Sequence, residues 1–458
     1  MTTPMLIDRV LTALYAHPTP VKAVVAATGG GASATRLLFR TGSSSTMLQF
    51  HVPYAKASLR RFLADGGEEG AVWTAPRPKF CSREMASRMA TSAWCQALSI
   101  LYEQDSEDGE EKRSLERFRS AIGIGCTAAL ATNYERRGAN QAFISVCRVR
   151  VDGAVESRTC ETFRVHLDKA MQRSREEEER IVSEYLVYVL VKTAGVDPEG
   201  CTALGKALQE ELKGPGDCFE KLKMEGEVPV SSIEGALARL GSTTLRSVAF
   251  LPEEKGDTIT VTADLPFKGI VVPGSFNPLH KGHVDLAIAA QKLVKTQLRK
   301  EFPVAFELAV ANADKGVIAT ETVLDRVKQF TSEPTFGRWP LLITNATLFN
   351  QKAELLQDCV FVIGADTAVR LVDKKYYGMD ETKMILALRQ LAQNGCSFVV
   401  AGRFDEKNSK RFISAEEVVD NHIPPVLKDV FIPLREADFR NDLSSTQIRN
   451  RATPKQSQ

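Results

Sequence analysis

Residues 271–291 read VVPGSFNPLHKGHVDLAIAAQ, and this stretch decides the fold of the second half of the chain. Its apolar start predicts a buried strand, and the segment after His283 has the spacing of an amphipathic helix. Between them, Gly274 lets backbone N–H groups approach a ligand, and the amino end of the helix offers unpaired donors suited to phosphate. His280 and His283 are three residues apart and share one face of a helical turn. The stretch therefore predicts a phosphate site in which two imidazoles donate hydrogen bonds as charge builds in a transition state.

Further apolar runs follow at intervals of about one helix. They are VAFELAVAN (304–312), PLLITN (340–345), CVFVIGAD (359–366), CSFVVAG (396–402) and DVFIPL (429–434). Strands that alternate with helices favour right-handed βαβ units. We therefore predict an α/β fold for residues 266–458, a doubly wound parallel sheet of Rossmann-like type.

A second motif lies near the end of the chain. Residues 441–449, NDLSSTQIR, combine a helix cap at Ser444 or Ser445 with Arg449 one turn later, where it can hold phosphates. Together with GSFNP (274–278) and HKGH (280–283), this motif resembles the HxGH nucleotidyltransferases, and among them the nicotinamide and nicotinate mononucleotide adenylyltransferases. GAD (364–366) and NADK (312–315) resemble further segments of that family. The resemblance covers residues from about 266 to 452.

The resemblance implies transfer of an adenylyl group from ATP to a pyridine mononucleotide, with NAD and pyrophosphate as products. It implies Mg²⁺ as the cofactor, which would bridge phosphate oxygens with few protein ligands, so we predict no metal site built by the protein. The catalytic residues that it implies are His280, His283 and Arg449. The nucleotide-binding residues that it implies are Gly274, Ser275, Phe276, Lys315, Gly364, Asp366, Asn441, Ser445 and Thr446.

The acceptor half of the predicted site departs from the family. Where the family has a tryptophan about ten residues after GAD, this chain has LVDKKYYG (371–378), with Tyr376 and Tyr377 as the aromatic candidates. Two alternatives therefore stay open. One is cytidylyl transfer to another phosphate acceptor, although the GSFNP and SSTxIR forms favour adenylyl transfer. The other is a nucleotide-binding scaffold without catalysis.

The first half of the chain carries a different set of motifs. ATGGGA (27–32), TGSSSTMLQFHVPYAKASL (41–59) and AIGIGCTAAL (121–130) resemble the CinA-type nicotinamide mononucleotide amidohydrolases. Ser43 and Tyr54 keep the separation of that family's nucleophile and tyrosine, but the family's lysine falls on Leu59, with Lys56 out of register. Because a serine needs a base to act as a nucleophile, we expect a degenerate domain that binds a ligand or self-associates.

These motifs suggest three regions. We predict a mixed α/β CinA-like domain at 1–195, a connector with some strands at 196–265, and the nucleotidyltransferase domain at 266–458. The acidic run REEEER (175–180) is expected to be a solvated helix surface. The GIGCTA stretch (123–128) resembles a dinucleotide-binding fingerprint, but we expect this match to be due to chance.

Composition limits the remaining function classes. The chain has 458 residues, 59 Lys and Arg against 57 Asp and Glu, and a net charge of +2, so bulk charge gives no reason to expect nucleic acid or an anionic membrane as a partner. Nine cysteines without a CxxC pair argue against a zinc ribbon or disulfide framework and favour a reducing compartment, the cytoplasm. No uncharged apolar stretch reaches the ~18 residues of a membrane span. CinA-type domains commonly self-associate, so that resemblance implies a homo-oligomer.

Overall fold

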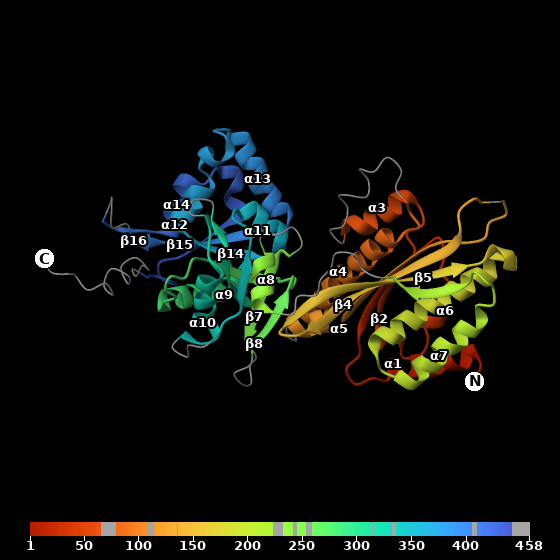
Figure 1. The fold of residues 1–458 in the computed structure, drawn as a ribbon. Helices are drawn as coiled ribbons and strands as arrows, with labels where there is room; N and C mark the ends of the chain where they lie inside the picture. The colour runs from red at the N-terminus through yellow and green to blue at the C-terminus, as the bar shows by residue number, and fades with distance from the viewer. Residues whose placement is uncertain are drawn as a thin grey trace. The chain divides into compact units, whose positions relative to one another are not determined.

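The computed structural model describes residues 1–65, 79–108, 114–134, 136–222, 232–240, 245–252, 259–299, 301–312, 316–331, 336–404 and 410–441. The chain divides into two compact units, and Figure 1 labels many of their helices and strands. The N-terminal unit comprises Met1–Arg150 and Arg158–Val228, and the C-terminal unit comprises Val151–Ser157 and Pro229–Gln458.

A set of parallel strands forms the centre of the C-terminal unit. In spatial order they are β18 (Phe431–Leu434), β15 (Ser397–Ala401), β14 (Val360–Gly364), β9 (Ile270–Pro273), β10 (Val304–Ala309) and β13 (Leu341–Thr344). Ile270 of β9 pairs with Val304 on one side and with Val360 on the other. Along the chain, β10 and then β13 are therefore added on one side of β9, whereas β15 and then β18 are added on the far side of β14. This confirms the predicted doubly wound sheet and puts its switch point, where such sheets bind ligands, between β9 and β14.

Two antiparallel strands extend this sheet beyond β13. β7 (Ser247–Pro252) pairs with β13, and β8 (Ile259–Ala263) pairs with β7. Ser157, from the short segment that belongs to this unit, pairs with Ala263 of β8. Residues 247–263, which the sequence assigns to a connector, are thus in part an extension of the C-terminal sheet.

Helices cover both sides of the C-terminal sheet. Figure 1 shows α9 (Lys281–Leu298) and α10 (Thr320–Thr331) on one side, and α12 (Ala365–Leu371), α13 (Glu381–Gln393) and α14 (Ala415–His422) on the other. α13 illustrates why these segments are helical. Asp380 caps it by accepting hydrogen bonds from two backbone N–H groups of the first turn, and Met384, Leu388 and Leu391 recur at helical spacing as its buried face.

The N-terminal unit is a mixed α/β structure, as predicted. Its strands lie in the order β6 (Cys218–Lys221), β5 (Val155–Leu167), β4 (Asn140–Asp152), β3 (Ala121–Ala129), β1 (Lys22–Thr28) and β2 (Met47–His51). β1 runs parallel to both of its neighbours, whereas β3 and β4 are antiparallel, as are β5 and β6.

Close packing explains the glycines of the fingerprint-like stretch. Gly123 and Gly125 lie within β3, against α4 (Arg83–Asp108). A Cβ atom at Gly123 would lie 2.1 Å from the Ala90 carbonyl oxygen, and one at Gly125 would lie 2.3 Å from that of Ala86. These glycines therefore let a helix approach the sheet. On the other face of the sheet lie α1 (Thr3–Tyr15), α6 (Arg175–Ala194) and α7 (Pro198–Glu211) (Figure 1).

The acidic run at the start of α6 is not a solvated surface throughout, so that prediction is wrong for two of its residues. Glu178 is buried and accepts a hydrogen bond from the Ala131 backbone N–H at 2.6 Å. Glu179 accepts hydrogen bonds from the backbone N–H groups of Gly31 at 3.1 Å and Ser33 at 3.0 Å. Tertiary partners, which a charge pattern does not reveal, determine the role of these carboxylates.

Part of the predicted connector also belongs to the N-terminal unit. α7 packs on α1 and α6, and Asp197 before it binds the Arg9 guanidinium through both carboxylate oxygens, at 2.8 and 3.1 Å. β6 adds a strand to the edge of β5. Within the part of the chain that the structure describes, no helix has both the length and the apolar character required to cross a membrane.

Candidate functional site

The turn between β9 and α9 has a constrained backbone. Phe276 has a positive φ of 44°, and its side chain is only 1% exposed. The Gly274 N–H donates to the Glu307 carbonyl oxygen at 2.9 Å, and a Cβ atom at Gly274 would lie 2.6 Å from the Phe276 ring. Glycine at 274 is therefore needed because the ring of Phe276 folds back over it.

The buried ring of Phe276 supports the site through contacts with neighbouring aromatic rings. Its ring meets His283 edge to face at 5.2 Å between centroids, Phe306 at 5.4 Å and Phe330 at 5.1 Å. Such edge-to-face contacts fix ring orientation. The sequence suggested Phe276 as a nucleotide contact, but with its side chain buried only the backbone of this residue faces the turn.

His280 and His283 lie together at the amino end of α9. His280 is the residue before the first helical turn, and the two rings stack with centroids 3.8 Å apart. The His283 Nδ1 accepts a hydrogen bond from the His280 backbone N–H at 3.3 Å. Because Nδ1 is the acceptor, the proton of the neutral ring is on Nε2, which becomes the donor.

Both imidazoles are neutral near pH 7. Burial lowers the pKa of His280. Burial, with a smaller effect from His280, lowers the pKa of His283 to about 3. Nδ1 of His280 is buried and has no hydrogen-bond partner among the described residues. The pair can therefore offer neutral hydrogen-bond donors to an anion, and the positive end of the α9 dipole adds to their effect.

The sequence did not reveal Gln329, which lies on α10. Its Nε2 donates to the Phe276 carbonyl oxygen at 3.3 Å, and its Oε1 accepts from the Leu279 backbone N–H at 2.7 Å. One side chain thus fixes both ends of the turn that leads into His280. No local signal marks this residue, because its partners lie about fifty residues earlier in the chain.

The next strand of the switch point contributes a second set of predicted residues. Gly364 ends β14 and caps α12, and a Cβ atom there would meet no atom of the described residues within 4 Å. Asp366, in the first turn of α12, forms an ion pair with Arg403, which follows the adjacent strand β15. Because β14 lies beside β9, these residues stand at the same edge of the sheet as the histidine turn.

Asn441 lies beside the histidine pair. A Cβ atom at Gly282 would lie 2.0 Å from Asn441 Nδ2 and 3.1 Å from His280 Cε1. Gly282 therefore makes room for the Asn441 amide against the first turn of α9. Ser275 is exposed within the turn. The other predicted site residues lie outside the described residues: Lys315, Ser445, Thr446 and Arg449.

The predicted hydrolase residues of the N-terminal unit are not assembled as a catalytic group. Ser43 starts a short 3-10 helix, and its hydroxyl makes no hydrogen bond with any described residue. Tyr54 is 75% exposed, and Leu59, at the position of the family's lysine, is buried. No general base therefore contacts Ser43 in the described part of this unit.

Comparisons with known proteins identify the C-terminal region. Residues 271–451 match the sequence model of the cytidylyltransferase-like family. The C-terminal unit contains a cytidylyltransferase-like domain. That family consists of nucleotidyltransferases, so the prediction of an enzyme that transfers phosphorus-containing groups is confirmed at this level. No curated protein matches the chain at a significant level.

Solved structures similar to the N-terminal region are CinA superfamily proteins. One, from Enterobacter cloacae, has 13% identity and a TM-score of 0.28, and the match covers 42% of this chain and 92% of that one. A competence damage-inducible protein A from Klebsiella pneumoniae has 13% identity and a TM-score of 0.29, over 43% and 98%. One from Agrobacterium tumefaciens has 17% identity and a TM-score of 0.28, over 42% and 94%.

A buried ion pair joins β10 and α11 within the cytidylyltransferase-like domain. Lys352, from α11 (Phe349–Leu355), lies 2.5 Å from Glu307 Oε1 on β10, which also accepts from the Thr344 hydroxyl at 2.5 Å. All three residues are buried. The signal that could have found this pair is the single Glu in the apolar run VAFELAV, since a buried carboxylate needs a partner.

No group of three or more His, Cys, Asp or Glu side chains that could hold a metal ion is present in the described segments of either unit. In the cytidylyltransferase-like domain the exposed carboxylate of Asp366, in the first turn of α12, is already paired with Arg403.

Proposed function

We propose that the C-terminal unit transfers the adenylyl group of Mg–ATP to the 5′-phosphate of nicotinamide or nicotinate mononucleotide. An oxygen of the acceptor's phosphate forms a bond to the α-phosphorus of ATP. The bond from that phosphorus to the oxygen bridging to the β-phosphate breaks, and pyrophosphate leaves with the bonding electrons. The observation that carries this proposal is the stacked pair His280 and His283 at the amino end of α9, at the switch point of the sheet.

The histidines suit this chemistry because they are neutral donors in a fixed geometry. The Nε2–H of His283 is held by the hydrogen bond at Nδ1, so it needs no reorganisation when charge builds on the phosphate oxygens. His280 adds a second ring 3.8 Å away. The reaction needs no covalent link to the protein, so catalysis would depend on positioning and charge stabilisation.

The predicted nucleotide contacts would complete the site around this pair. Gly364, with no other described residue close to its Cα, would let the nucleotide approach the backbone, and Asp366 and Asn441 would hold hydroxyl or amide groups. Gly274, Ser275 and the backbone of Phe276 would contribute the turn. The roles of Lys315, Ser445, Thr446 and Arg449 as phosphate contacts rest on their sequence motifs alone.

Magnesium would enter this site as part of the substrate. With no cluster of metal-binding side chains among the described residues, the ligands would be phosphate oxygens of ATP and water, the set that Mg²⁺ prefers in phosphoryl-transfer sites. The ion would neutralise phosphate charge, and the chain's own residues would orient the phosphates.

Pyrophosphate release tests the proposal directly. We expect release with Mg–ATP plus nicotinamide or nicotinate mononucleotide, dinucleotide formation by chromatography, and loss of both signals when either substrate or Mg²⁺ is omitted. The name of the matching family favours one rival, cytidylyl transfer, so CTP with phosphocholine is the parallel reaction. Turnover of CTP but not ATP would replace our proposal with that rival. Nucleotide binding by calorimetry with no pyrophosphate from either pair would indicate a scaffold.

For the N-terminal unit we propose a non-hydrolytic role, because no base contacts Ser43 among the described residues. Its self-association is tested by size-exclusion chromatography with light scattering on the full chain, for which we expect a dimer or larger assembly. A monomeric mass at all concentrations would contradict this.

A further inference from the structure

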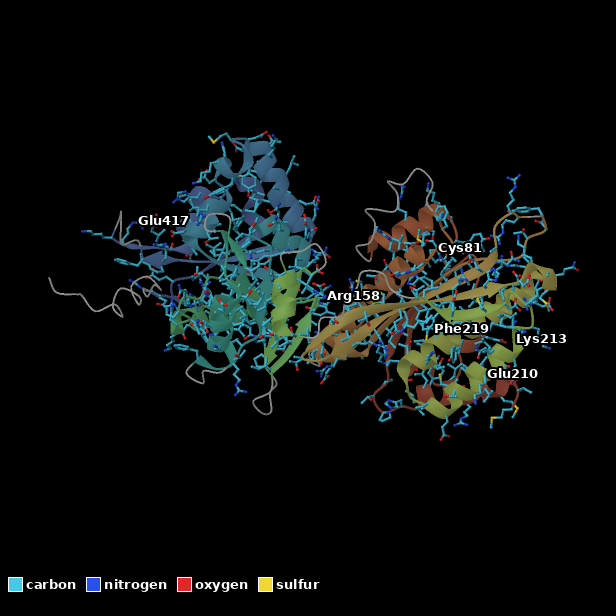
Figure 2. All side chains as sticks on the ribbon, in the orientation of Figure 1. Cys81, Arg158, Glu210, Lys213, Phe219 and Glu417 are labelled. Carbon is cyan, nitrogen blue, oxygen red and sulfur yellow. The ribbon has the colours of Figure 1, made fainter. Side chains whose placement is uncertain are left out.

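A cavity of about 580 Å³ lies in the N-terminal unit, at the carboxyl end of α6. Its floor is aromatic, with Phe163 of β5, Phe219 of β6 and Tyr188 of α6. Figure 2 labels Phe219, whose ring stacks on that of Phe163 with centroids 5.4 Å apart. Residues of the predicted CinA-like domain (1–195) thus form only part of the cavity wall. The rest of the wall comes from α7 and β6, which lie in the predicted connector.

One face of α7 forms the opposite wall. The residues of α7 that line the cavity recur every three or four positions: Pro198, Cys201, Thr202, Gly205, Lys206 and Gln209. This face carries Lys206 and Gln209 among smaller residues, whereas Leu204 and Leu208 form the buried face. A Cβ atom at Gly205 would lie 2.7 Å from the Tyr188 hydroxyl oxygen, so glycine leaves room for that hydroxyl at the cavity wall.

The lining has an excess of positive charge. It contains Lys192, Lys206 and Lys221 and no acidic residue. Lys221 is paired with Glu161 at 2.9 Å. Lys192 Nζ instead lies over two rings of the floor, 5.6 Å from the centre of Phe163 and 5.4 Å from that of Tyr188. Lys206 has neither an ion pair nor a hydrogen bond with any residue in the described ranges.

We propose that this cavity binds a small organic anion that carries a flat ring, of the size of a nucleoside monophosphate. The aromatic floor would stack with the ring, and Lys192 and Lys206 would bind the anionic group. The volume lies within the usual range for small-ligand sites, ~300–1,000 Å³. The cavity differs from the predicted hydrolase site, because Ser43, Tyr54 and Lys56 are not among its lining residues.

Lysine footprinting tests this proposal at the cavity itself, whatever the C-terminal unit binds. We would measure acetylation rates of Lys206 in the full chain by mass spectrometry, with exposed Lys213, just beyond α7 and outside the lining (Figure 2), as the internal reference. We expect saturating AMP or CMP to slow acetylation of Lys206 at least fivefold and to leave Lys213 unchanged. Failure of both nucleotides to protect Lys206 would overturn the proposal.

Three further measurements separate the parts of the proposal. Adenosine and inorganic phosphate at the same concentrations should each slow acetylation of Lys206 less than twofold. If phosphate protected as well as AMP, the proposed role of the ring would be overturned. If adenosine protected as well as AMP, the proposed role of the anionic group would be overturned. Lys192→Gln should weaken the AMP concentration dependence of protection at least tenfold, and Lys213→Gln should not. Protection that persists unchanged in Lys192→Gln would also overturn the site. Thermal midpoints of the variants would establish that they are folded.

Discussion

The side-chain amide of Gln329 donates a hydrogen bond to the carbonyl oxygen of Phe276, at 3.3 Å, across two elements that are far apart in the sequence. The same amide accepts from Leu279 N–H, so the turn before His280 is held at two points. Because these two hydrogen bonds hold both ends of the turn that leads into His280, we expect the position of His280 to depend on Gln329.

Replacing Gln329 with Glu tests this dependence. A carboxylate can still accept from Leu279 but cannot donate to Phe276, so we expect kcat for pyrophosphate release to fall about tenfold with little change in KM. Lys328→Gln, at the exposed neighbouring position on α10, is the matched control. An unchanged kcat in Gln329→Glu would show that the amide only stabilises the fold.

His283→Ala removes the oriented Nε2–H donor and should lower kcat by about 100-fold or more, as the loss of a preorganised donor does in other enzymes. His283→Gln, which can place an N–H near the same point, should retain more activity than the alanine variant. His422→Ala, at the exposed end of α14, serves as control. Full activity in His283→Ala would refute the proposed role of the histidine pair.

Two glycine substitutions separate packing from ligand approach. In Gly282→Ala the new Cβ would displace the Asn441 amide, a movable side-chain end, so we expect a small change in thermal midpoint and a clear loss of turnover. In Gly364→Ala the new Cβ meets no atom of the residues that the structure describes within 4 Å, so the change should leave stability unchanged while raising the KM for ATP. Comparable ATP affinity in Gly364→Ala and wild type would argue against a nucleotide at this strand end.

The buried histidine predicts how stability depends on pH. The pKa of His283 is about 3 in the folded chain, against about 6.5 when unfolded, so between these values the unfolded state binds the extra proton. Stability should therefore be lost as the pH falls from 6.5 towards 3, by roughly 3 kcal/mol at pH 4. The difference in thermal midpoint between wild type and His283→Gln, measured from pH 7.5 to 4.5, should shift steadily against the wild type. Parallel curves would contradict the low pKa.

The buried pair of Glu307 and Lys352 predicts an asymmetric response to mutation. Lys352→Met leaves a carboxylate buried without its cation and should destabilise the chain by about 3–5 kcal/mol, measured by denaturant unfolding. Glu307→Leu combined with Lys352→Met removes both charges and should recover most of that loss. A double variant no more stable than Lys352→Met would show that the pair itself, rather than its balance of charge, supports the sheet.

The sequence predicted the parallel sheet and the histidine pair because both have local signals, namely apolar runs at helix-length intervals and a glycine turn before a helix. It could not predict Gln329, since the partners of that amide come from a distant segment. The sequence also could not predict that the Phe276 side chain is buried, because the motif around Phe276 predicts contact with a ligand. Glu178 was predicted to be solvated because it lies in a run of charges. Its burial depends on contact with a segment distant in the sequence, at Ala131, which the charge pattern does not reveal.

The hydrogen bonds from Gly31 and Ser33 to Glu179 have a consequence for the N-terminal unit. Backbone N–H groups gathered at a glycine turn attract anions, and here a carboxylate of the same chain already accepts from two of them. A free anion must compete at that turn with an occupant that is permanently tethered, present at an effective concentration on the order of millimolar or more. Weakly binding metabolite anions would therefore leave this turn undisturbed.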